Sequence, residues 1–393
     1  MRTDNVVDMN GEEMIYRREK KEKKRNRHYI DYSLILVVLF LTAFGLLLIY
    51  SATSYDYGTY YIKRQGLASG LGLTVMIITA LIPYRIYDRF SVWIYLISTF
   101  SVLLVLTKLG VTAGNATRWI KIYGGFNLQP AEITKIGVII MIASLTAHMG
   151  KRMNAWKAML IVLALAILPF LLIYRVTDNL STAIIVFGIA MFMYLIACTD
   201  WKKIVSLIGV AVLAGAGIFL YVYNAITSPN PEKSMRITRI MAWLHPEDYT
   251  DDTSYQTLQG LYAIGSGGIM GKGLGEGVQK LSIPEAQNDM IFTVLCEELG
   301  LFGAFAVLTL FIILIWRLMV VANNAKDIFG SMLVVGVMAH ISLQVIFNVG
   351  VVTNTLPNTG ISLPFISYGG SSALFLFAEM GIVLSVCRSI SAD

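Results

Sequence analysis

The chain has 393 residues, of which 56% are hydrophobic and only 14% are charged. A soluble domain carries about 25% charged residues, so this composition excludes a soluble globular protein and indicates an integral membrane protein with many spans. The net charge is +6, but nine of the 31 basic residues precede residue 30. The positive charge is therefore a signal of membrane topology and does not indicate nucleic-acid binding.

The first 29 residues form a segment of their own, which is polar and densely basic. We expect this segment, residues 1–29, to be a disordered cytoplasmic tail. Such a tail can anchor the chain on anionic lipid, or it can dock a partner protein, and the sequence leaves both roles open.

Ten apolar runs follow, each close to the roughly 20 residues that a helix needs to cross a bilayer. They lie at about 31–51, 67–83, 91–108, 131–149, 157–173, 180–198, 203–223, 290–316, 329–350 and 371–388. We therefore predict an all-α, polytopic fold with ten transmembrane helices in one membrane domain, residues 30–388, and a short cytoplasmic C-terminus at 389–393.

Orientation follows from the basic residues, which are concentrated in cytoplasmic loops of membrane proteins. The basic tail places the N-terminus in the cytoplasm, and an even number of spans returns the C-terminus to the same side. Every long loop then faces outward: 52–66, 109–130, 224–289 and 351–370. The 224–289 loop, between the seventh and eighth spans, is the largest, so we expect a site to be built on this face.

The second of these loops leads into the fourth span through polar residues. Pro130 suits the first turn of a helix, and Glu132 and Lys135 lie on one face just inside the span. The two side chains could form an ion pair at the membrane interface. Alternatively, Lys135 and Arg118 could bind the oxygens of an anionic substrate, with Glu132 beside them.

The largest loop contains a glycine run from Gly265 to Gly277 that includes Lys272. The run departs from a phosphate-binding Walker sequence, because residue 266 is serine and Gly273 follows the lysine. Glycine still allows the backbone to approach a ligand closely, so Lys272 remains a candidate for substrate binding. Asp289 ends the loop where the eighth span begins. It could face the positive end of that helix or take part in chemistry, and spacing favours neither.

The last loop ends in a turn that leads into the tenth span. Glycines followed by serines at a helix start present free N–H groups, which form an anion site. The candidates are Ser367, Gly369, Gly370 and Ser371. Inside the tenth span, Glu379 is an ionisable residue within the membrane and hence a functional candidate, although a packing role with a polar partner is also open.

Together, the outward loops offer one candidate base, several cations and two glycine-rich turns, without a cluster of metal ligands. The three cysteines, Cys198, Cys296 and Cys387, have no metal-ligand or disulfide spacing. From the residues alone, this pattern predicts binding of an anionic, lipid-linked substrate at the outer leaflet, with acid–base chemistry.

Several of these motifs, taken together, resemble the SEDS family, which comprises the FtsW, RodA and SpoVE proteins, and the pattern leans towards the FtsW and SpoVE branch. The matching motifs are Ile49-Tyr50-Ser51-Ala52, Arg64-Gln65, Arg118-Trp119-Ile120, Gln129-Pro130-Ala131-Glu132-Ile133-Thr134-Lys135, Ala263-Ile264-Gly265-Ser266-Gly267-Gly268, Gly271-Lys272-Gly273-Leu274-Gly275, Pro284-Glu285-Ala286 to Asp289, Glu297-Glu298-Leu299-Gly300 and 363–372.

The resemblance implies a peptidoglycan glycosyltransferase in the bacterial cytoplasmic membrane that polymerises lipid II on the outer face. It implies a class B penicillin-binding transpeptidase and other division or elongation membrane proteins as partners. Asp289 matches the family's catalytic aspartate and would take the proton from the acceptor hydroxyl, with inversion at the donor sugar. Arg118 and Lys135 would stabilise the undecaprenyl diphosphate that leaves. A divalent cation, Mg²⁺ or Mn²⁺, is a further expectation from the family.

Two other functions fit many of the same residues. A flippase for lipid II or another lipid-linked sugar would use ten spans and intramembrane charges such as Glu379 and Lys135. It should line a path through the membrane midplane, whereas the polar motifs here gather at the outer edge. A non-catalytic division scaffold would not need an intact Asp289.

Overall fold

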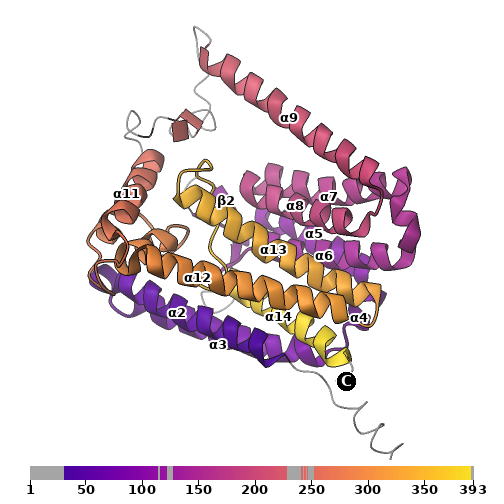
Figure 1. Cartoon of the computed structure of the whole chain (residues 1–393), viewed down its shortest axis with the longest axis horizontal. Coiled ribbons are helices and arrows are strands. Elements are labelled where there is room, and N and C mark those ends of the chain that lie inside the picture. Colours follow the sequence, from indigo (N-terminus) through magenta and orange to yellow (C-terminus); the bar gives the residue numbers. More distant parts are fainter. Residues whose placement is uncertain are drawn as a thin grey trace, which may run out of the picture.

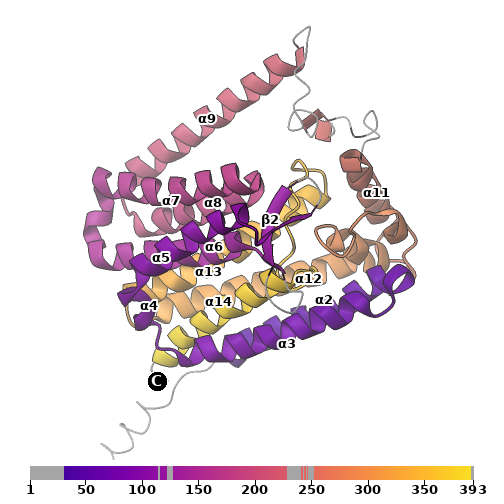
Figure 2. The same cartoon turned by 180° about the vertical axis from the view of Figure 1, so that it is seen from behind.

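The computed structural model describes residues 31–113, 116–121, 127–227, 240–241, 243–244, 246 and 252–390. The predicted tail at 1–29, part of the 224–289 loop and the last residues of the C-terminus lie outside the described residues. The described residues form a bundle of long helices (Figures 1 and 2).

The first half of the chain contributes three long helices, a small sheet and several short helices. They are α2 (Tyr32–Tyr57), α3 (Tyr60–Leu81), α4 (Arg85–Arg89), α5 (Ser91–Phe100), η1 (Ser101–Leu106), β1 (Gly110–Ala113), β2 (Ala116–Lys121), β3 (Asn127–Leu128), α6 (Pro130–Met149) and η2 (Gly150–Asn154).

The second half is helical apart from its loops. Its elements are α7 (Trp156–Thr177), α8 (Leu180–Ala197), α9 (Trp201–Thr227), α11 (Asp252–Gly267), η3 (Gln279–Ser282), α12 (Ile291–Asn324), α13 (Ile328–Val352) and α14 (Gly370–Ser389).

Eight helices in the described part of the chain have the length and apolarity to cross a membrane, and they are α2, α3, α6, α7, α8, α12, α13 and α14. The predicted span at 91–108 is α5 continued by η1, which is a shorter apolar stretch. The predicted span at 203–223 lies in α9, which is not among the eight and extends away from the bundle (Figure 1). The polytopic helical fold is therefore confirmed, and the count of ten spans stays a prediction.

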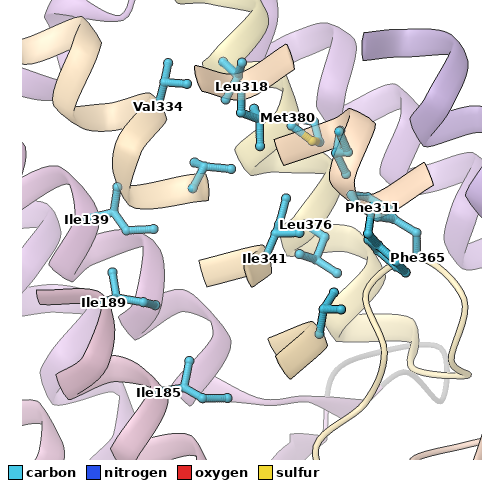
Figure 3. Close-up of a cluster of buried hydrophobic side chains, with 14 of the residues drawn as sticks. Ile139, Ile185, Ile189, Phe311, Leu318, Val334, Ile341, Phe365, Leu376 and Met380 are labelled. Atoms are coloured by element: carbon cyan, nitrogen blue, oxygen red, sulfur yellow. The ribbon is translucent and has the colours of Figure 1, made fainter. Parts of the chain in front are cut away.

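The core of the bundle surrounds α13, which packs against α6, α8, α12 and α14. Figure 3 shows this interior, to which α6, α8 and α13 contribute the buried side chains of Ile139, Ile189 and Ile341. Most of the buried residues of α13 are apolar, but His340, Gln344 and Asn348, spaced four residues apart, form a buried polar row along one face of the helix.

Close packing between α3 and α14 depends on two glycines. A Cβ atom at Gly72 would lie 2.3 Å from the ring of Phe377, and one at Gly381 would lie 2.4 Å from the carbonyl oxygen of Met76. Small residues allow transmembrane helices to approach in this way, because lipid offers no hydrophobic driving force between them.

A buried polar pair joins α13 to α14. His340 Nδ1 lies 2.8 Å from Glu379 Oε2, and both side chains are 1% exposed. The sequence left open whether Glu379 had a functional role or a polar partner for packing, and the structure supplies the partner. Pairing satisfies a carboxylate that would be expensive to bury alone.

The prediction of an all-α fold holds for the bundle but misses a small sheet in the loop before α6. Strand β2 pairs antiparallel with both β1 and β3. Val111, Thr112 and Ile120 are β-branched, and their backbone groups need partners once the chain leaves the helix. The strands are too short to give a clear alternating pattern, and the sequence predicted residues 109–130 only as an outward-facing loop.

Helix α12 is broken at Gly300, whose φ is +64°. Residues 267–277, called the glycine loop here, complete the backbone hydrogen bonds at this break. Lys272 N–H donates to the Glu297 carbonyl at 3.0 Å, and Leu301 N–H donates to the Gly268 carbonyl at 3.0 Å. Irregular backbone is tolerated within a membrane protein only when such partners exist. The glycine run is therefore explained by the hydrogen bonds that it forms with the backbone at the break in α12.

Candidate active site

A cavity of about 710 Å³ lies at the end of the bundle that carries the sheet and α11. Its walls come from β2, the first turns of α6 and α8, the helix α11, the turn before α12, and the segment that leads into α14. Among the described residues, six charged side chains line it, three of each sign: Arg64, Arg118, Lys135, Glu132, Glu285 and Asp289. Parts of the chain that are distant in sequence thus converge on one polar chamber.

Asp289 stands on the wall of this cavity, in the turn just before α12. Gln256 Nε2 from α11 donates to Asp289 Oδ1 at 3.4 Å, and Asn358 Nδ2 donates to Gln256 Oε1 at 3.1 Å. Burial, and to a smaller extent the nearby charge of Glu285, raise the pKa of the Asp289 carboxyl to about 6, although hydrogen bonds from the backbone and from Gln256 oppose the rise. A carboxyl with this pKa is mostly ionised at neutral pH and can still take up a proton, which is what a general base requires.

A side chain of α13 fixes the backbone of Asp289. Asn348 Nδ2 donates to the carbonyl of Asp289 at 2.7 Å and to the carbonyl of Ile361 at 2.8 Å. One buried amide therefore holds the turn of Asp289 and the segment after α13 together. The site rests on a rigid transmembrane helix although the carboxylate itself is in a turn.

Glu132 and Lys135 form an ion pair at 2.8 Å, with their side chains 6% and 1% exposed, and both line the cavity. The two interpretations of this pair are therefore compatible. Glu132 Oε2 is buried and finds no partner within the described residues. A ligand hydroxyl or a water molecule entering the cavity would satisfy it.

Arg118 of β2 is half-buried and lines the cavity. Its Nε and Nη2 atoms donate to the carbonyls of Thr177 and Asp178, each at 3.3 Å. These bonds link β2 to the α7–α8 connection and orient the guanidinium group. The short strands that position Arg118 were not predicted from the sequence.

The turn before α14 divides the predicted anion-binding residues. Gly369, Gly370 and Ser371 line the cavity, while Ser367 is buried beneath it and its Oγ accepts the Leu363 N–H at 2.7 Å. The Gly369 N–H already donates to Gln65 Oε1 at 3.1 Å. The structure thus brings three of these four residues to the site and gives Ser367 a role in shaping the turn.

Lys272 lies away from the cavity. Its Nζ donates to Glu297 Oε1 at 2.8 Å, and the same carboxylate accepts the N–H groups of Val278 and Gln279. Next to it, Lys280 Nζ donates to Glu298 Oε1 at 2.6 Å. The two buried carboxylates hold the glycine loop on α12, so the geometry gives Lys272 a structural contact and no contact with the cavity.

Sequence reasoning missed the amides that position the carboxylate: Gln256, Asn348 and Asn358. Asn348 was detectable, because a polar residue inside an apolar span is a functional candidate by default. Gln256 and Asn358 gave no such signal, since each lies in a polar segment where amides are common. Their significance depends on contacts between segments far apart in the chain.

The fold and the cavity together define a polytopic membrane protein with a polar cavity at one end of the bundle, lined by charged residues of both signs. Residues 31–392 match the family model of the FtsW, RodA and SpoVE proteins, described as cell cycle proteins. The chain belongs to this family.

Its relatives match over nearly their whole length. A probable peptidoglycan glycosyltransferase FtsW from Geobacter metallireducens is 35% identical, covering 91% of this chain and 94% of the relative. The stage V sporulation protein E of Bacillus subtilis is 33% identical, covering 91% and 97%.

Two solved structures share the fold. One chain comes from a study of the structural coordination of polymerization and crosslinking by a peptidoglycan synthase complex; it has a TM-score of 0.76 at 25% identity and covers 91% of this chain and 98% of the other. The rod shape determining protein RodA of Thermus thermophilus has a TM-score of 0.67 at 23% identity, covering 93% and 98%.

Proposed function

We propose that this protein is a peptidoglycan glycosyltransferase that polymerises lipid II at the outer face of the bacterial cytoplasmic membrane. The observation that carries the proposal is Asp289, a carboxylate with a pKa near 6 on the wall of a chamber that also holds Arg118 and Lys135. Relatives named as probable peptidoglycan glycosyltransferases support the reaction class.

In this reaction Asp289 takes the proton from the attacking sugar hydroxyl of the acceptor. The new bond forms at the anomeric carbon of the donor as the bond to the undecaprenyl diphosphate breaks on the opposite face. The sugar configuration therefore inverts. Gln256 keeps the carboxylate oriented, and Asn348 keeps its backbone in place.

The leaving diphosphate needs positive charge around it. Arg118 and Lys135 both line the cavity and would supply part of this charge, Lys135 from within its ion pair with Glu132. The cavity holds equal numbers of cations and carboxylates, so a bound diphosphate would leave it with excess negative charge. A divalent cation, Mg²⁺ or Mn²⁺, would balance that charge.

Glu285 offers carboxylate oxygens of the kind that such an ion prefers, and the diphosphate would supply others. Within the described residues there is no group of three or more acidic, histidine or cysteine side chains that could form a complete metal site. The donor set therefore fits an ion that arrives with the substrate and completes its coordination with water.

The same proposal includes a class B penicillin-binding transpeptidase as partner, and other division or elongation membrane proteins around it. A relative in fold was solved as part of a peptidoglycan synthase complex, which supports this assembly. We also propose that both termini lie in the cytoplasm, because the basic tail favours that side.

A flippase is less well supported by the positions of the polar residues. The charged groups that line the cavity gather at one end of the bundle, whereas the paired His340 and Glu379 are buried in the bundle and do not line it. A transport path would need polar groups that continue through the midplane.

The test is polymerisation of lipid II by the purified protein with its transpeptidase. We expect glycan strands from the wild type and none from Asp289→Asn, which keeps the shape of the side chain but removes the base. Asp289→Asn should retain partner binding and thermal stability. Polymer from the variant would remove Asp289 from its role, and no polymer from the wild type beside an active control would refute the enzyme.

Arg118→Ala provides a second arm of the same assay. Loss of a charge-assisted contact to the diphosphate should raise the apparent KM for lipid II by about tenfold or more. The matched control is Lys121→Ala, an exposed cation on the same strand that does not line the cavity. An unchanged KM for Arg118→Ala would contradict the diphosphate role.

A further inference from the structure

Four tyrosine rings form a continuous row beside the cavity, and neither the proposed chemistry nor the helix packing uses them. Tyr61 stands at the centre, edge to face with Tyr57 at 5.0 Å, with Tyr60 at 5.3 Å and with Tyr368 at 4.9 Å between ring centroids. We call these residues the tyrosine row. They come from the end of α2, the start of α3 and the turn before α14.

The row runs from open surface to the wall of the cavity. Tyr57 and Tyr60 are 55% and 52% exposed, whereas Tyr368 lines the cavity together with Arg64. Arg64 Nη1 donates to Tyr60 Oη at 2.6 Å, and its guanidinium lies 5.5 Å from the centre of the Tyr60 ring. The row and the chamber that holds Asp289 are therefore one continuous surface.

Tyrosines at the end of transmembrane helices commonly serve as an aromatic belt at the lipid headgroups. Tyr55, on the same turn and 81% exposed, fits that description because it takes part in none of these ring contacts. The row differs in being packed edge to face, which fixes the rings relative to one another while leaving two of them exposed. Rigid, amphipathic tyrosines of this kind give contact area at a small loss of conformational entropy.

We propose that the tyrosine row is a saccharide-binding subsite that holds the glycan strand next to the reacting sugar. This inference rests on the glycosyltransferase function proposed above. The C–H faces of pyranose rings match the faces of tyrosine, and the sugar hydroxyls can bond to phenol oxygens and to Arg64. The row is uncharged, so it suits the sugars, while Arg118 and Lys135 on β2 and α6 suit the diphosphate.

The subsite has a specific consequence for the product. A strand that stays bound after each addition receives the next sugar before it dissociates, so the strength of this contact sets the length of the glycan. Removing one exposed ring should weaken binding of a free saccharide by about fivefold to tenfold, as expected for the loss of one aromatic contact. The chains made from lipid II should become shorter.

The experiment uses the full-length protein in nanodiscs of anionic lipid. The probe is a soluble, uncrosslinked glycan tetrasaccharide without a polyprenyl group, and its binding is titrated without lipid II. Strand length is then measured with lipid II on gels that resolve individual glycans. The variants are Tyr57→Ala and Tyr57→Phe, with Tyr55→Ala as the control for a belt tyrosine from the same turn.

We expect Tyr57→Ala to weaken tetrasaccharide binding and to shorten the glycan strands. Tyr57→Phe should retain both the binding and the strand length, because it keeps the aromatic ring. Tyr55→Ala should match the wild type. Equal binding and equal strand length in Tyr57→Ala would overturn the subsite while leaving the polymerase intact. The same loss in Tyr55→Ala and Tyr57→Ala would also overturn it and indicate a lipid anchor only. Because saccharide binding is measured without turnover, failure of the polymerisation assay would not be confused with failure of the subsite.

Discussion

Asp289 combines a buried position with weak hydrogen-bond support, and this combination sets the pH dependence of the reaction. Burial raises the pKa of its carboxyl to about 6. A general base must be deprotonated, so the initial rate should fall about tenfold per pH unit below 6 and level off above 7. Initial rates of lipid II polymerisation between pH 5 and 8 would measure this limb. A rate independent of pH over that range would contradict the assignment.

Gln256 should shift the same limb, because its bond to Asp289 Oδ1 favours the charged form and lowers the pKa. Gln256→Ala removes this bond, so we expect the rate profile to move to higher pH by about half a unit. Asn358→Ala, which only releases Gln256, should move it less in the same direction. A purely structural role would lower the rate equally at every pH and leave the midpoint unchanged.

At the scale of single elements, the glycine loop and the broken helix α12 depend on each other. Gly300 has φ +64°, and a Cβ there would lie 2.4 Å from the backbone nitrogen of Gly271. Gly300→Ala should therefore lower the free energy of unfolding by about 3 kcal/mol or more, since strain and backbone overlap add together.

The matched control is Gly268→Ala, where φ is +58° but the space around the added Cβ is open. It should cost only about 1 kcal/mol, which is the backbone strain alone. Thermal unfolding in detergent would compare the two variants. Similar losses of stability would show that the loop does not pack tightly on α12.

The buried pair between α13 and α14 gives a second test at this scale. Glu379→Leu should lose about 3 kcal/mol of stability, because it leaves His340 buried without its partner. The double variant His340→Leu/Glu379→Leu should recover most of that loss, since leucines replace the pair with apolar contacts. Additive losses in the double variant would contradict the coupling.

The elements differ in how far the sequence could predict them. The length of the apolar runs predicted the long helices α2, α7 and α13, because a helix needs a continuous apolar run to cross a bilayer. The sheet around Arg118 was missed because its strands are too short to show a period. Asp289, Arg118, Glu132 and Lys135 were named from the sequence and do meet in the cavity. Lys272 was named as a ligand candidate because it lies in a glycine run, and its pairing with Glu297 could not be predicted because it depends on the folded chain.

At the scale of the whole molecule, the orientation in the membrane can be tested with single cysteines. The three native cysteines, 198, 296 and 387, are all buried and should give little background labelling. Ser362→Cys lines the cavity and should react with a membrane-impermeant maleimide added outside spheroplasts. Lys151→Cys, exposed at η2, should react only after the membrane is permeabilised. The opposite pattern would invert the proposed topology.

The amide of Asn348 has a mechanical consequence. The amide bonds to the carbonyls of both Asp289 and Ile361, so a displacement of one backbone segment also displaces the other. If a bound partner moves residues 354–362, these two hydrogen bonds transmit the movement to Asp289. Binding of a partner at the surface would thereby change the position of the Asp289 carboxylate in the cavity.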